Sequence, residues 1–171
     1  MLFFSRINVF SLVREHFLTL YDNRTGKTNW LEVFLLSFFT LAIPAVLVLW
    51  LKQPIEPTEN DCFLTVFSIA VGFLSSTLFV LADRKTSVRE ANSVTRLKEC
   101  FYNTAFALIS ALFVIFCYIL MIILLRAFRD FNLENYIPHL LNIGSFIIYA
   151  LIVLFFHAML MVIRRVFFIF D

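Results

Sequence analysis

The segment "YDNRTGKTNW" contains "TGKT", which resembles the end of a phosphate-binding loop. That loop, G-x-x-x-x-G-K-[ST], needs its first glycine five positions before the second, because the backbone N–H groups between them wrap the phosphates. With Gly26 as the second glycine, the first should stand at position 21, where the sequence has Tyr21. A long apolar run beginning at Trp30 follows, instead of the opening helix of a soluble nucleotide-binding domain. The sequence therefore argues against a nucleotide site.

His157 is the only ionisable residue in an apolar run over 140–163. Ionisable groups inside a membrane usually have a function, and a proton pathway would add acidic partners at the same depth. Glu32 could approach His157 only if the first and fourth apolar runs touch. The favoured interpretation is a neutral histidine that hydrogen-bonds to a neighbouring helix.

The cysteines Cys62, Cys100 and Cys117 fall at different depths of the apolar runs, so neither a disulfide nor a metal cluster is expected. The sequence has no recognisable aspartate pair, Ser/His pair or zinc motif of an intramembrane protease. We therefore predict no enzymatic activity, no cofactor and no metal site.

The composition indicates that much of the chain is surrounded by lipid rather than by water. Hydrophobic residues make up 61% and charged residues only 15%, whereas soluble domains are about half apolar. Four runs are long enough to cross a bilayer, which takes about 20 helical residues; they are 30–51, 62–82, 101–125 and 140–163. Backbone groups find no water in lipid, so these runs must be helical. We predict an all-α integral membrane protein, a bundle of four transmembrane helices.

Charge placement predicts the orientation of these helices. All of the 14 lysines and arginines except Lys52, Arg126 and Arg129 fall in three segments, namely 1–29, 83–100 and 164–171. By the positive-inside rule these segments and both termini are cytoplasmic, while 52–61 and 126–139 are outer loops. The segment "TGKTNW" then becomes the approach to the first membrane span.

Residues 1–29 are expected to begin with an amphipathic helix, because apolar residues recur every three or four positions. They are Phe3, Ile7, Phe10, Val13, Phe17 and Leu20. This helix either lies on the inner leaflet, which we favour, or docks a partner.

The segment 83–100 is predicted to be a basic cytoplasmic helical hairpin. Its cations are Arg84, Lys85, Arg89, Arg96 and Lys98. They either hold the loop inside against anionic lipid or form the docking surface for an acidic partner.

Ser68, Gly72 and Ser76 form a stripe of small residues at four-residue spacing in the second span. Such a stripe lets helices approach closely, either within the bundle or between copies in a homo-oligomer. With Thr65, Ser75 and Thr77 it is also a thin polar stripe of the kind a pore would need. Pro44 is expected to bend the first span, because it leaves the carbonyl of Thr40 without its helical donor.

The chain is small and combines four spans, the outer loops "KQPIEPTEND" and "RAFRDFNLENYIPH" and an inward basic hairpin. This layout resembles the membrane subunit of Kiwa, a two-component bacterial anti-phage system. The resemblance implies an oligomeric inner-membrane sensor of phage attachment that holds a cytosolic DNA-binding effector. It implies no particular functional residue.

The residues thus favour a non-catalytic sensor and scaffold that oligomerises and recruits a cytosolic effector, without binding nucleic acid itself. A pore-forming effector or small channel is the alternative. A membrane enzyme or lipid carrier would need charged residues at depth, and the spans contain few.

Overall fold

The structure is a computed structural model that describes residues 9–18, 21–22, 27–28, 30–55, 62–87 and 91–170. Its helical elements are α1 (Val9–Leu18), α2 (Trp30–Ala45), the π-helical turn η1 (Val46–Trp50), α3 (Cys62–Ser87), α4 (Ala91–Asp130), the 3-10 turn η2 (Glu134–Tyr136) and α5 (Ile137–Phe170). Two-residue strands, β1 (Tyr21–Asp22) and β2 (Lys27–Thr28), pair in antiparallel register. Four helices are long and apolar enough to cross a membrane, which confirms the predicted helical membrane-protein class.

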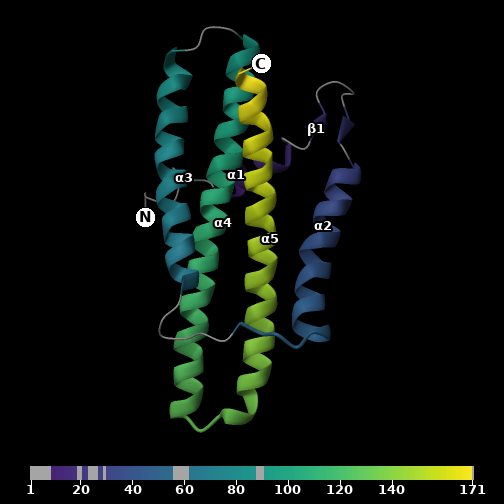
Figure 1. The fold of residues 1–171 in the computed structure, drawn as a ribbon, viewed down its shortest axis with the longest axis vertical. Coiled ribbons are helices and arrows are strands. Elements are labelled where there is room, and N and C mark those ends of the chain that lie inside the picture. Colours follow the sequence, from purple (N-terminus) through teal and green to yellow (C-terminus); the bar gives the residue numbers. More distant parts are fainter. Residues whose placement is uncertain are drawn as a thin grey trace.

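The four long helices are arranged as a row rather than as a closed square. α4 packs against α3 on one side and α5 on the other, and α2 packs against the far side of α5 (Figure 1). α2 and α3 therefore lie at opposite edges and present most of their surface outward. Large apolar side chains on both edge helices are exposed, among them Phe34 on α2 and Phe79 on α3. Such surface is stable when lipid, rather than water, surrounds it.

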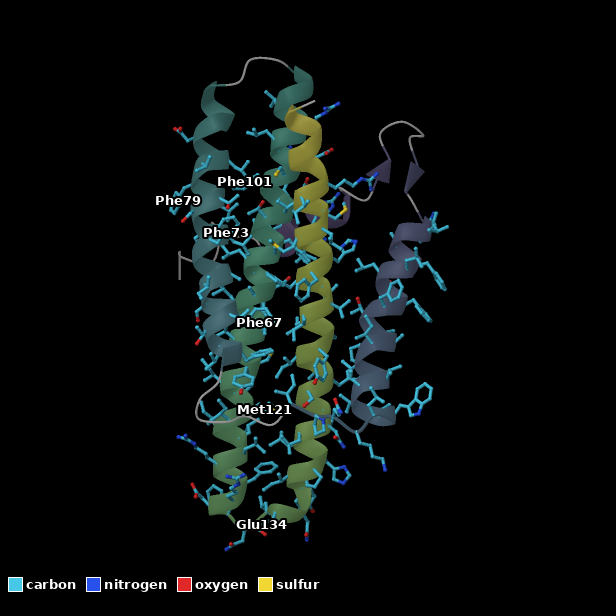
Figure 2. All side chains as sticks on the ribbon, viewed as in Figure 1. Phe67, Phe73, Phe79, Phe101, Met121 and Glu134 are labelled. Carbon is cyan, nitrogen blue, oxygen red and sulfur yellow. The ribbon has the colours of Figure 1, made fainter. Side chains whose placement is uncertain are left out.

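The core lies where α4 meets α3 and α5. Ala107, Ala111 and Ala158 are fully buried, and such small side chains let the helices approach closely. Larger side chains fill the remaining space, and Figure 2 shows Phe67 and Met121 within this group of helices. A second cluster closes the end of the bundle near the 83–100 segment; its members are Leu81, Leu97, Cys100 and Val162.

The spans differ widely in length. The candidate spans cover 18 residues in the first span, 21 in α3, 35 in α4 and 31 in α5, and the α4 span includes charged residues at both ends, such as Arg96 and Asp130. At 1.5 Å per residue these correspond to about 27, 32, 52 and 46 Å. Figure 1 shows the consequence, because the α4–α5 hairpin extends well beyond the ends of α2 and α3.

α2 with η1 is the element whose length matches a bilayer. Trp30 and Trp50 stand at its two ends with exposed fractions of 77% and 79%. Tryptophan prefers the boundary between hydrocarbon and headgroups, and the hydrocarbon core is about 30 Å thick. The two indoles therefore mark the positions at which the membrane boundaries are expected.

Pro44 lies next to a change in the helical hydrogen-bond pattern, and the predicted bend of the first span stays a prediction. Pro44 is fully buried inside α2, and the helix widens into the π-helical turn η1 two residues later. In that turn the N–H of Leu51 donates to the carbonyl of Val46 at 2.9 Å. A proline has no N–H to continue the regular ladder, so a local rearrangement next to it is expected.

The connection between α4 and α5 is tight. α4 ends with Asn132 at a φ of 56°, a left-handed conformation that asparagine tolerates well. Asn132 N–H donates to Arg129 O at 3.1 Å and Leu133 N–H to Phe128 O at 2.8 Å, the pattern of a Schellman cap. Much of the segment 126–139 is consequently helical.

Residues 51–55, which follow η1, lie against α5. The backbone N–H of Ile55 donates to the buried Ser145 hydroxyl at 2.8 Å, and the Tyr149 hydroxyl donates to the Gln53 carbonyl at 3.3 Å. These bonds hold the end of the first span against α5.

Candidate functional site

The most distinctive polar cluster lies where α1 meets α4. Leu12 and Val13 of α1 pack on the main core, and His16 is 1% exposed. α1 packs against α4 and crosses behind it in Figure 1, near the level at which α2 begins. The N-terminal helix therefore docks on its own chain through a face that includes a histidine.

Two contacts on α4 hold the imidazole of His16. Its Nδ1 lies 2.7 Å from the Oδ1 of Asn103, which is fully buried, and since an amide oxygen only accepts, Nδ1 donates. The ring also stacks on Phe106 with centroids 3.9 Å apart and planes 3° from parallel. Asn103 and Phe106 are three residues apart, so they share one face of α4.

His157 of α5 completes the cluster. Its ring meets that of His16 edge to face, with centroids 6.2 Å apart and planes at 86°. The neighbour of His157 is thus a histidine on α1, while the side chain of Glu32 lies outside the described part of the chain. Three polar residues on three helices converge at this point, and their chemistry suits positioning one helix on two others.

Sequence reasoning missed His16 and Asn103. His16 lies next to the predicted apolar stripe of the N-terminal helix, three residues after Val13, and a neutral histidine can occupy such an edge position. Asn103 follows the start of an uncharged run, where an amide needs a partner once buried. The sequence signal for this contact was an asparagine in a predicted span together with a histidine on an amphipathic helix.

The predicted docking cations fall on α3, on α4 and in the segment between these helices. Arg96 and Lys98 are exposed on α4, and the Lys98 ammonium lies 5.7 Å from the centre of the Tyr102 ring. Arg84 and Lys85 occupy the last turn of α3, with side chains outside the described part, and Arg89 lies outside it entirely. Docking by these residues stays a prediction.

The small-residue stripe faces outward. Ser68, Gly72 and Ser76 are exposed, and a Cβ built on Gly72 would meet no atom within 4 Å. The close approach between helices occurs instead at Gly144, where a Cβ would lie 2.8 Å from the Met121 sulfur. The stripe therefore does not serve packing within the described part of this chain, and self-assembly through it stays a prediction.

No metal-ligand cluster occurs in the described ranges, since no three His, Cys, Asp or Glu side chains come together there. Cys100 is buried and Cys117 is half-buried, and neither forms a disulfide in the described ranges. The described side chains thus point to structural contacts at the polar cluster.

Comparisons with known protein families, with curated proteins and with solved structures yield no match for this chain.

Proposed function

We propose that this protein is a non-catalytic sensor and scaffold of the bacterial inner membrane, which oligomerises and recruits a cytosolic effector. The observation that supports this proposal best is the unequal length of the spans. The stretches without Asp, Glu, Lys or Arg in α4 (101–125) and α5 (140–163) are longer than those of the first span (33–51) and α3 (62–82) by roughly 5–9 Å at 1.5 Å per residue. No bilayer of uniform thickness matches both pairs.

Because of this mismatch, the free energy of the protein in the membrane depends on the thickness of the bilayer. Mismatch costs fractions of a kcal/mol per Å, so a thickness change of several Å shifts the balance between two arrangements by on the order of a few kcal/mol. A shift of that size is enough to redistribute a two-state equilibrium. A protein of this design senses membrane perturbation without an active site.

In the proposed orientation both termini and the 83–100 hairpin are cytoplasmic, and the α4–α5 tip points outward. The basic hairpin residues then form the docking surface for an acidic region of the effector. The resemblance to the Kiwa membrane subunit supports a role in anti-phage defence, in which phage attachment is the perturbation and the effector binds DNA.

Copurification tests the recruitment step. The tagged protein, extracted from its native host in mild detergent, is expected to carry a stoichiometric cytosolic partner on a large oligomer. Replacing Arg96 and Lys98 by glutamate is expected to lower partner recovery about tenfold or more, because like charges across an interface repel. The measurement is quantitative mass spectrometry of the eluate together with particle sizing.

The matched control replaces both cations by glutamine, which removes charge without reversing it and should give an intermediate loss. Membrane insertion of each variant is verified by protease protection of the tagged terminus. Full partner recovery by a correctly inserted glutamate variant would remove the hairpin from the docking model.

Self-assembly is tested at Gly72. Leucine there is expected to dissociate the oligomer in detergent, because the side chain would fill the space that a second helix occupies at the stripe. The fold of the single chain should persist, since no atom lies near the new Cβ. Native mass spectrometry reads the copy number, with Ile69→Leu, an exposed position off the stripe, as the control. An unchanged copy number in the Gly72 variant contradicts assembly through this face.

The alternative function, a pore, draws on the same outward-facing stripe, because several copies could turn it toward a common axis. The hydroxyls of Ser75, Ser76 and Thr77 donate to carbonyls of their own helix, at 2.8, 3.1 and 2.9 Å. Hydroxyls bonded in this way also suit a lipid or helix interface. Leakage of a small dye from liposomes holding the purified oligomer would favour the pore over the scaffold.

A further inference from the structure

The contact surface between α1 and the rest of the chain is unusually polar for the interior of a membrane protein. The most deeply buried α1 side chain in the described part is His16, and it faces the fully buried Asn103. Leu12 and Val13, which pack beside it, are only partly buried. Among the described side chains, the contacts of α1 thus include a hydrogen bond, a ring stack and an apolar contact through Leu12 and Val13.

A contact of this composition is easier to open than an apolar one. When α1 leaves, His16 and Asn103 exchange their mutual hydrogen bond for bonds to water, so the net loss is much smaller than the bond's strength in an apolar medium. α1 has ten residues, and a helix of that length is marginal in water by itself. The docked position of α1 consequently depends on the contacts at His16.

The docking site is shared between the two longest helices. Asn103 and Phe106 belong to α4, and His157, whose ring edge approaches His16, belongs to α5. A hydrogen bond of 2.7 Å and a stack at 3.9 Å both weaken steeply when their partners shift by an ångström. The hydrogen bond and the stack both join α1 to α4, and α5 meets His16 through the edge of the His157 ring.

We propose that α1 is a detachable helix, held on α4 by the His16–Asn103 hydrogen bond and the Phe106 stack, beside the His157 ring of α5. Release uncovers Asn103 and frees the N-terminal segment. This inference goes beyond the proposed sensor function, because it assigns the moving part and needs no effector to be observed.

Cysteine labelling in lipid nanodiscs tests the proposal. The reporter is Val13→Cys, on the docked face of α1, in a background in which Cys62, Cys100 and Cys117 are alanine. Its reaction rate with a water-soluble maleimide measures how often α1 is undocked. Arg14→Cys, at an exposed position next to it, is the matched reference for a freely reacting thiol.

The parent reporter is expected to react more slowly than the Arg14 reference. Either His16→Ala or Asn103→Ala should raise the Val13→Cys rate about tenfold or more, because the remaining polar group is buried without its partner. The double variant His16→Leu/Asn103→Leu should react no faster than the parent, since replacing both partners by apolar groups of similar size is nearly neutral.

Three outcomes overturn the proposal: a parent rate equal to the reference, single variants that react at the parent rate, or a double leucine variant that reacts as fast as the single alanine variants. Elution volume and the thermal unfolding midpoint establish that each variant retains its fold. If one single variant aggregates, the other single variant decides, because labelling at the parent rate contradicts the proposed contact and faster labelling supports it. None of these results depends on oligomerisation or on an effector, so the proposed function stands or falls separately.

Discussion

Leucine in place of Gly144 is expected to destabilise the α4–α5 hairpin more than any other single substitution considered for this protein. A Cβ at this position would lie 2.8 Å from the Met121 sulfur and 3.4 Å from its Cγ. Met121 is 3% exposed within the main core, so leucine must force the two helices apart or displace core side chains. Overpacking of this kind costs roughly 1–3 kcal/mol or more.

The free energy of unfolding in mixed detergent measures this effect. Gly144→Ala should give a smaller loss, because the methionine side chain can bend away from a single methyl group. Gly72→Leu is the matched control, since leucine at this exposed site meets no neighbouring atom in the chain. If Gly144→Leu unfolds at the same denaturant concentration as the parent, the close approach of α4 and α5 at this residue is not what stabilises the hairpin.

Bilayer thickness is expected to change the self-association of this protein by a factor of ten or more. In thin bilayers the exposed apolar side chains of the long helices outreach the hydrocarbon core, and clustering of copies covers them. On α5 these side chains run from Ile143 through Phe156 to Ile163, a length of about 30 Å. Association should therefore be strongest in thin bilayers and weaken as the thickness of the hydrocarbon core approaches the length of this apolar stretch.

Energy transfer between labelled copies, in vesicles of phosphatidylcholines with increasing acyl-chain length, measures this dependence. Vesicles with constant chain length but different headgroups are the control, because they change surface charge without changing thickness. The Gly72→Leu variant separates the two sources of association, since it alters the α3 face and leaves the span lengths intact. Equal association at every thickness would remove the mismatch from the sensing mechanism.

The helix boundaries show which features of the fold the sequence predicts and which it does not. The third run was predicted as 101–125, and the structure extends α4 from Ala91 to Asp130. A hydropathy pattern detects the part that suits lipid, whereas the helix continues through polar residues such as Arg96, Lys98 and Glu99, which favour helices in water as well. The number of spans and the helical extension through the 83–100 hairpin were therefore predictable, and the residues at which each helix ends were not.

The polar cluster of His16, Asn103 and His157 is a feature that could not be predicted from the sequence. His157 was visible as an isolated histidine in an apolar run, but its neighbour could not be inferred, because His16 lies 141 positions earlier on a helix that could equally have rested on the lipid. Only the docking of α1 on α4 brings the two rings to a centroid distance of 6.2 Å. Likewise, the spacing of Ser68, Gly72 and Ser76 could not show whether the stripe faces inward or outward.

The sequence by itself determines that this chain has four apolar segments of membrane-spanning length and that they are helical, because its composition suits lipid and a backbone in lipid must satisfy its own hydrogen bonds. The tertiary structure decides the order α3–α4–α5–α2 and the face that each helix buries. Phe67 is 6% exposed and Phe79 is 77% exposed on the same helix, although both are phenylalanine. Lipid and protein core are equally apolar, so hydrophobicity cannot distinguish the two positions, and shape and close packing between helices make the choice.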